Sequence, residues 1–135
     1  MNTSKTYTLS RNGPLLGVRV AIIGRRHQAI VLRLLVDTGA SFTILPVEAV
    51  ERIGCDTHHP LRTVRIVAAN GILVAPVVKV PSFNCLGAKI DDFPVVAHTL
   101  PTETLVDGLL GMDFLSRCRA VLDVHGASIR VRPHS

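Results

Sequence analysis

The segment LLVDTGASFTILP, residues 34–46, constrains the fold of this chain more than any other stretch. Leucine and valine before Asp37 predict a buried strand, so an ionisable side chain stands at the end of a core element. A charge there is unfavourable unless other groups bond to it. Gly39 predicts a tight turn whose backbone a Cβ would disfavour, and the Thr38 hydroxyl can hydrogen-bond at its base. Such a turn suits a catalytic aspartate, although Asp-Thr-Gly is also an ordinary turn sequence.

The length of 135 residues predicts one domain, 1–135, which is long enough for a hydrophobic core. Valine and isoleucine are frequent, aromatic residues make up only 4%, and eight prolines and ten glycines punctuate the chain. That composition favours short strands joined by turns. Residues 1–12 are predicted to form a flexible arm or an interface strand.

The sequence contains no apolar stretch as long as a transmembrane helix, so we expect no membrane segment. The N-terminus is polar and lacks the apolar region of a signal peptide. Three scattered cysteines, Cys55, Cys85 and Cys118, are odd in number and are best read as reduced thiols. Together these features predict a cytoplasmic protein.

The net charge of +5 raises the question of nucleic acid as a partner. Most basic residues stand singly between apolar ones, and Arg25-Arg26-His27 is the only compact cluster. One tyrosine and no tryptophan leave little material for stacking bases. We therefore expect a solvated basic surface and no nucleic acid; a nucleic-acid binder would instead show affinity that falls steeply with salt.

Apolar and polar residues alternate in a way that predicts short strands with two short helices. Asn70-Gly71 between two β-rich runs is a strong hairpin signal. Pro46 suits the first position of a short helix that Gly54 ends. Two later strands are predicted to join at Asp91-Asp92. The expected strands are 16–22, 29–36, 42–45, 63–69, 72–80, 83–90, 93–98, 120–124 and 127–132; the helix is 46–54, and a strand followed by a second helix lies within 105–117.

In order along the chain, three motifs resemble those of retropepsin-type, single-domain aspartic proteases, particularly their bacterial branch. The first is the Asp37 segment; the second is Ala68-Ala69-Asn70-Gly71, where that family has the tip of its flap; the third is GLLGMDFL at residues 108–115. The resemblance spans about residues 15–131. It implies an all-β, retropepsin-like half-barrel with short helices after the Asp-Thr-Gly strand and near the C-terminus.

The resemblance also assigns roles to residues. Asp37 would be catalytic, and the flap would be a mobile cover over the cleft, although a long hairpin is also ordinary sheet structure. No metal and no organic cofactor are implied. The remaining assignments are Thr38, Gly39 and Ala40 in the active-site turn; Ala68, Ala69, Asn70 and Gly71 at the flap tip; and Leu109, Leu110 and Gly111 as support behind the turn.

One Asp-Thr-Gly per chain implies a homodimer, because aspartic proteases use two carboxylates about 3 Å apart that share one proton. The second Asp37 would come from another copy across a two-fold axis. By resemblance, Thr38 would bond across that axis. The expected activity is that of an aspartic endopeptidase on a polypeptide substrate, with Ala40, Ala68, Ile72 and Leu109 as apolar cleft walls.

A rival interpretation is a catalytically silent retropepsin-like module that kept this fold and serves for peptide binding or dimerisation. Viral family members usually place acidic residues after the catalytic turn and an arginine after the glycine segment, which form an ion pair. Ser41-Phe42 and Met112-Asp113 stand there instead, so that ion pair is absent and the strength of the dimer is open.

Other polar residues receive ordinary interpretations. Asp107 and Asp113 are expected at a turn and a helix start, and Asp123 is expected to pair with a neighbouring arginine. Residues 55–59, CDTHH, do not have the spacing of a zinc site and are expected to form a polar loop.

Overall fold

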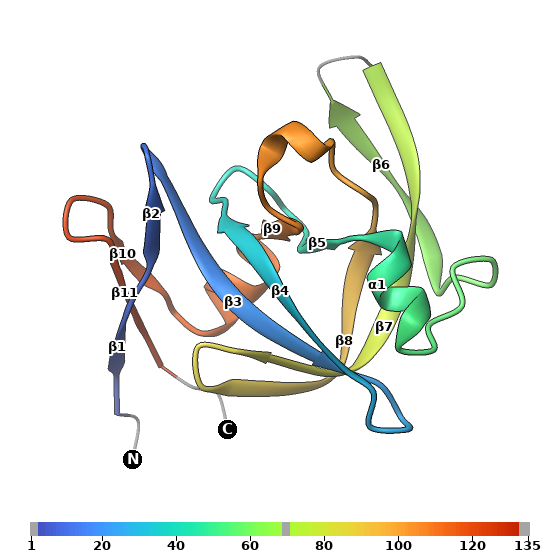
Figure 1. The fold of residues 1–135 in the computed structure, drawn as a ribbon, viewed down its shortest axis with the longest axis horizontal. Helices are drawn as coiled ribbons and strands as arrows, with labels where there is room; N and C mark the ends of the chain where they lie inside the picture. The colour runs from blue at the N-terminus through green and yellow to red at the C-terminus, as the bar shows by residue number, and fades with distance from the viewer. Residues whose placement is uncertain (1–2, 69–70, 133–135) are drawn as a thin grey trace.

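The computed structural model describes residues 3–68 and 71–132 and confirms the all-β fold with two short helices (Figure 1). The strands are β1 (Lys5–Thr8), β2 (Ser10–Asn12), β3 (Leu15–Ile23), β4 (Ala29–Val36), β5 (Ile44–Leu45), β6 (Arg62–Ala68), β7 (Gly71–Cys85), β8 (Ala88–Ala97), β9 (Gly108–Leu110), β10 (Val121–Asp123) and β11 (Ser128–Val131). The helices are α1 (Val47–Arg52), the 3-10 turn η1 (Thr102–Thr104) and α2 (Met112–Arg117). One sheet has the order β2-β3-β4-β9-β5-β8-β7-β6, and a further pairing of β3 with β7 closes it on itself; the other has the order β1-β11-β10.

The β3–β4 hairpin delivers the chain to Asp37, as predicted. Val20 and Ile22 of β3 are buried, whereas Arg19 is exposed and stands opposite Arg33 of β4 in the ladder. This alternation places one face of the hairpin in the core and the other in solvent. Full burial of an aliphatic side chain contributes about 1.5–3 kcal/mol, so a slip of one residue in register would be strongly unfavourable.

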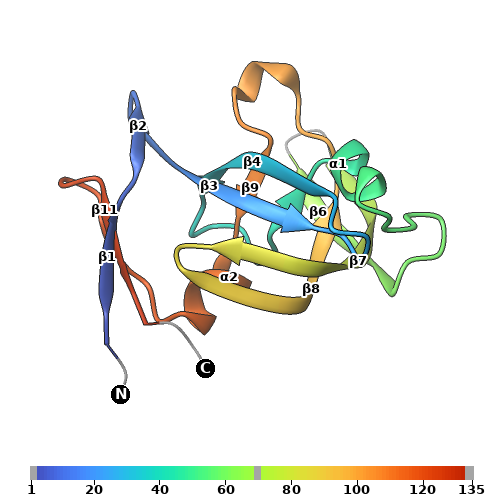
Figure 2. The ribbon, with the colours of Figure 1, turned by 60° about the horizontal axis from the view of Figure 1, so that its bottom comes forward.

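The turn between β7 and β8 differs from the prediction. The chain reverses at Leu86-Gly87, where both residues have positive φ (50° and 75°), and not at Asp91-Asp92. The ladder runs on through Asp91, which pairs with Ser82. Asp91 and Asp92 are both exposed, so their charges remain in solvent while the strand continues. Figure 2 shows this hairpin lying along β3, whose residues Val20 to Ile23 pair with β7.

The first and last strands, β1 and β11, pair in the small sheet. β1 is antiparallel to β11, with Lys5 opposite Val131, and both run along one side of the molecule (Figure 1). Residues 5–8 and 10–12 of the predicted arm are therefore strands of this chain. The Arg11 guanidinium also donates to the carbonyls of Val124 and His125, at 2.8 and 2.9 Å.

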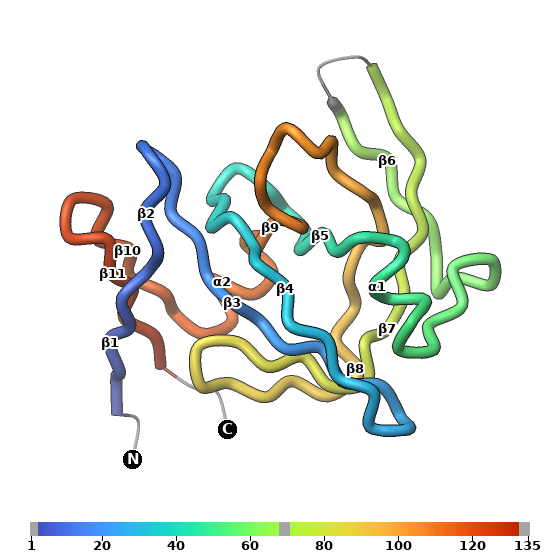
Figure 3. Tube along the Cα trace, viewed as in Figure 1, coloured from blue at the N-terminus to red at the C-terminus, as the bar shows by residue number. Residues whose placement is uncertain are grey.

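Two apolar clusters support the sheet. The larger contains the aromatic rings of Phe83, Phe93 and Phe114, whose centroids lie 4.7–6.5 Å apart. The smaller contains Ile44 and Val96 under the β6–β7 hairpin, which extends away from the rest of the sheet in the trace of Figure 3. These clusters hold the strands that carry the candidate site.

The first helix is one residue shorter at its start than predicted. Pro46 is the N-cap of α1 in extended conformation, and Val47 is the first helical residue. Glu48 lies in the first turn and Arg52 in the last, as the helix dipole favours. The predicted second helix is α2, and the predicted closing hairpin is β10–β11.

Candidate active site

Asp37 follows β4 directly and is held by backbone and side-chain hydrogen bonds. Its amide donates to the carbonyl of Leu110 at 3.0 Å, which ties the turn to β9. Its carbonyl accepts from the Ala40 amide at 3.2 Å, and its carboxylate Oδ1 accepts from the Gly39 amide at 2.9 Å. The carboxylate is therefore fixed in direction by the turn that carries it.

Gly39 does not adopt the unusual backbone conformation that the sequence predicted for the turn. Its φ is outside the left-handed region. A Cβ at Gly39 would instead lie 3.3 Å from Oδ1 of Asp37, so the missing side chain leaves room at the carboxylate. Thr38 is exposed, and its hydroxyl makes no hydrogen bond to another described residue of the chain.

Strand β9 lies behind the turn. It runs parallel to β4, with Leu35 opposite Leu109 and Val36 opposite Leu110. Leu110 is fully buried. Gly111 follows, and a Cβ there would lie 2.6 Å from the backbone of Phe42, which explains why this position is glycine. The structure thus places the three predicted support residues against the segment that contains Asp37.

A buried polar network that the sequence did not reveal links these segments. Thr43 is fully buried, and its hydroxyl donates to Oδ1 of Asp113 at 2.8 Å and accepts from the Gly111 amide at 3.2 Å. The Thr43 amide donates to Oδ2 of Asp113 at 2.9 Å. Asp113 also accepts from the Phe114 amide, as expected at a helix start. The signal in the sequence was a threonine between two apolar residues and, much later in the chain, an acid two positions after a glycine.

Asp107 and Asp123 both have structural contacts. Oδ2 of Asp107 accepts from the Arg33 amide at 2.8 Å, which fastens the loop before β9 to β4. Asp123 accepts from the Gly126 amide at 2.9 Å. The ion pairs found among the described residues do not include Asp123, so its predicted arginine partner was wrong.

A cleft of about 440 Å³ opens at Asp37. Ala40 and Leu109 line it, as expected of cleft walls, whereas Ile72 does not and is 59% exposed. The other lining residues are Gly39, Ser41, Phe42, Ile44, Arg65, Ile66 and Val67. A carboxylate with fixed orientation beside a largely apolar cleft can activate water next to a bound polypeptide.

A family model described as aspartyl protease matches residues 18–114, which is most of the chain. The chain belongs to the aspartyl protease family. A solved structure described as a retropepsin-like aspartic protease from Rickettsia conorii is similar, with a TM-score of 0.71 and 19% identity, over 98% of this chain and 94% of that one. No curated protein sequence matches the chain. The retropepsin-like fold and the family are thus confirmed, while the bacterial branch stays a prediction.

The predicted flap tip of this aspartyl protease falls only partly within the described residues. Ala68 and Gly71 close the β6–β7 ladder opposite each other, and Gly71 has a φ of 123°. Ala69 and Asn70 lie outside the described residues.

Polar groups of the loop at residues 55–59 hydrogen-bond to one another. Asp56 accepts from Nδ1 of His59 at 2.7 Å and from the His58 amide at 2.9 Å, and these bonds lower the pKa of its carboxyl below 3.8. Within residues 3–68 and 71–132, no cluster of three or more His, Cys, Asp and Glu could hold a metal. The same part of the chain has no helix long and apolar enough to cross a membrane.

Proposed function

We propose that this protein is a homodimeric aspartic endopeptidase, in which each subunit contributes one Asp37. The supporting observation is the braced turn: the Asp37 carboxylate is oriented by the Gly39 amide and faces a cleft with apolar walls. The sequence has no second Asp-Thr-Gly, so the pair of carboxylates that this chemistry requires needs two chains.

In the proposed reaction, two Asp37 carboxyl groups share one proton and hold one water. The ionised carboxylate removes a proton from the water, whose oxygen attacks the carbonyl carbon of the scissile peptide. The protonated carboxyl donates a hydrogen bond to the oxyanion that forms. Collapse of this intermediate breaks the C–N bond as the nitrogen receives a proton. Water thus supplies hydroxyl to the new acid and hydrogen to the new amine.

The surface beside the turn suits contact with a second copy. Thr38 is exposed there and lines a hollow of about 170 Å³ with Val36, Met112 and Leu115. Met112 is 40% exposed, although it is a large apolar side chain. A partner turn that covered this surface would bury these groups and provide a bonding partner for the Thr38 hydroxyl.

The β6–β7 hairpin suits the role of a cover over the substrate. β6 is an edge strand, so its outer backbone groups are available to pair with an extended peptide. Val67, Ile72 and Val74 expose 84%, 59% and 61% of their surfaces in the single chain. Apolar side chains beside the scissile bond would cover such surfaces.

The test is cleavage of a mixed peptide library between about pH 4 and 7, by the native protein and by Asp37→Asn. Acid-favoured cleavage that rises faster than linearly with protein concentration, and that Asp37→Asn abolishes, is the expected result. Absence of cleavage at concentrations where sedimentation shows a dimer would reject the enzyme and favour the silent peptide-binding module.

A further inference from the structure

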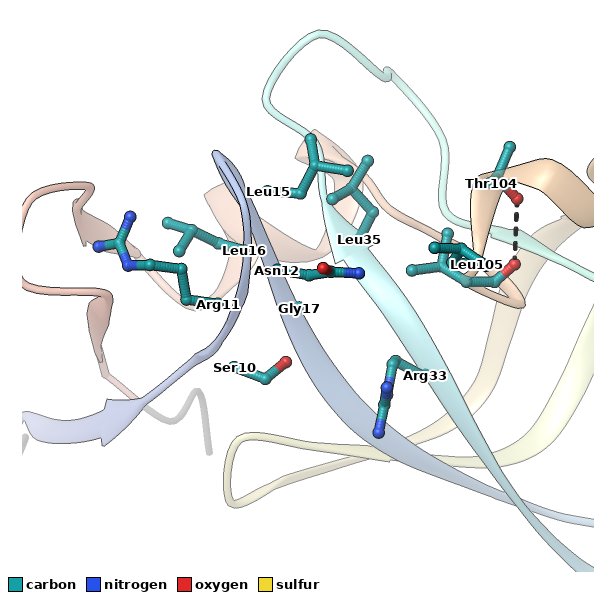
Figure 4. Close-up of a pocket in the computed structure, with 11 residues that line it drawn as sticks. Ser10, Arg11, Asn12, Leu15, Leu16, Gly17, Arg33, Leu35, Thr104 and Leu105 are labelled. Carbon is teal, nitrogen blue, oxygen red and sulfur yellow. Dashed lines mark hydrogen bonds between the residues drawn. The ribbon is translucent and has the colours of Figure 1, made fainter.

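The solvent face of the β3–β4 hairpin carries a groove that the chemistry at Asp37 does not use. Two adjoining hollows, of about 170 and 390 Å³, share Arg33 and Leu105 as lining residues. Figure 4 shows the first hollow, with Leu15 and Leu35 on one side and Leu105 on the other. We call this surface the basic groove; it comprises Leu15, Arg19, Val31, Arg33, Leu35 and Leu105.

The centre of the basic groove holds two positive charges without a balancing acid. Arg19 and Arg33 stand directly opposite each other on neighbouring strands, and both are exposed. Like charges in that position destabilise a sheet. The ion pairs among the described residues involve neither guanidinium. An anion between the two side chains would remove the repulsion and form charge-assisted hydrogen bonds.

The one acid that lines the groove has a different task. Asp107 accepts a hydrogen bond from the backbone amide of Arg33, and its own amide donates to the Arg33 carbonyl, both at 2.8 Å. It lies beyond ion-pair distance of the Arg19 and Arg33 guanidinium groups. The groove therefore keeps a net attraction for an incoming anion.

Apolar side chains flank the cations. Leu105 is 71% exposed and has a φ of 61°, a left-handed conformation that is strained for a branched residue. Hydrogen bonds from the Thr104 hydroxyl to the carbonyls of Pro101 and Val106 hold the loop in this shape, and the second of them is the dashed line in Figure 4. Val31, on the other side of the arginines, is 65% exposed. Aliphatic groups beside a cation pair suit a polypeptide carboxylate with apolar neighbours, and they offer no aromatic platform for bases.

The basic groove is also aligned with the active-site turn. Arg33 and Leu35 are alternate residues of β4 and share a face, and Asp37 comes directly after the last residue of that strand. The strand rise places the Cα of Arg33 about 13 Å from that of Asp37, the span of about four residues of an extended peptide. We propose that the basic groove binds an acidic side chain of the polypeptide substrate, about four residues from the bond that is cleaved. This inference rests on the proposed function.

Binding is measured first, with the cleavage-deficient Asp37→Asn full-length protein and a fluorescent peptide in which two glutamates alternate with leucine and valine. The control peptide has the same sequence with glutamine in place of both glutamates. We expect at least fivefold tighter binding of the glutamate peptide at low salt. Arg19→Gln/Arg33→Gln should abolish this difference in affinity. Arg19→Glu/Arg33→Glu should make the protein bind a peptide with lysine in place of glutamate more tightly than the glutamate peptide.

The matched control is Arg25→Gln/Arg26→Gln, which removes the same charge from the far end of the same hairpin. It should keep the preference for glutamate. Equal affinity for the two peptides, or equal loss in the control variant, would overturn the proposal. Tighter binding of a single-stranded oligonucleotide through Arg19 and Arg33 would also overturn it, because the groove would then serve a different partner.

Cleavage provides the second measurement. In a peptide library cut by the native protein, acidic residues should be enriched at least threefold about four positions from the cut. Arg19→Gln/Arg33→Gln should remove that enrichment, and Arg25→Gln/Arg26→Gln should keep it. Cleavage without enrichment would reject the groove as a substrate site and leave the protease intact. Glutamate-selective binding without any cleavage that depends on Asp37 would reject the proposed function and leave the groove a peptide-binding surface.

Discussion

Replacement of Thr43 by valine removes the hydroxyl that joins the active-site segment to α2 while nearly preserving the side-chain shape. The hydroxyl donates to Asp113 and accepts from the amide of Gly111, and the side chain is fully buried. Loss of a buried bond to a carboxylate, together with a Gly111 amide left buried without a partner, should lower the free energy of unfolding by about 3 kcal/mol.

Urea unfolding measures this effect. With a slope of about 2 kcal/mol/M, the midpoint should fall by about 1.5 M. Protein concentration must be equal in all samples, because dimer formation stabilises the folded chain by mass action. Thr43→Ser is the matched control: it keeps the hydroxyl, loses one methyl group and should cost about 1 kcal/mol. A loss below about 1 kcal/mol for Thr43→Val, or a larger loss for Thr43→Ser, would refute the role of the hydroxyl.

Three further results are expected. Gly39→Ala should fold normally but cleave peptides at least tenfold more slowly, since its methyl group would crowd Oδ1 of Asp37; an unchanged rate in a peptide assay would contradict this. Burial raises the pKa of the Cys85 thiol, so Ellman's reagent should label it only after unfolding, and rapid labelling of the native protein would be the contrary result. NMR titration should show that His59→Ala raises the pKa of Asp56 toward 3.8. The lowered pKa stabilises the folded protein at pH values above the pKa of Asp56 in the unfolded chain, and this stabilisation disappears as the pH falls through its pKa in the folded protein.

Local sequence patterns predicted most of the strands, most clearly where one face of the strand is buried, as in β3 and β4. The β3–β4 hairpin and the closing β10–β11 hairpin have alternation that only one register satisfies. The β7–β8 turn was misplaced because two adjacent acids resemble a turn, whereas the chain reverses at Leu86-Gly87 in positive φ. Leucine gives no sequence signal for that conformation.

The position of Asp37 could be predicted, but the groups that brace it could not. The turn signature is local, whereas the bonds from Asp37 to Leu110 and from Thr43 to Asp113 join residues about seventy positions apart. Pairing over such distances depends on which strands become neighbours, and alternation along a strand does not contain that information. The glycine at 111 is explained only when the backbone of Phe42 is seen against it.

The pairing of β1 with β11 has a consequence for biosynthesis. Lys5 faces Val131 and Thr8 faces Ser128, so β1 leaves the ribosome well before its partner β11 has been made. Contacts this distant in sequence form late, because the intervening chain must first be ordered. Until β11 is available, the backbone of β1 is an open template for any other strand, including the β11 of a neighbouring copy. We therefore expect this domain to complete its fold only after β11 has left the ribosome.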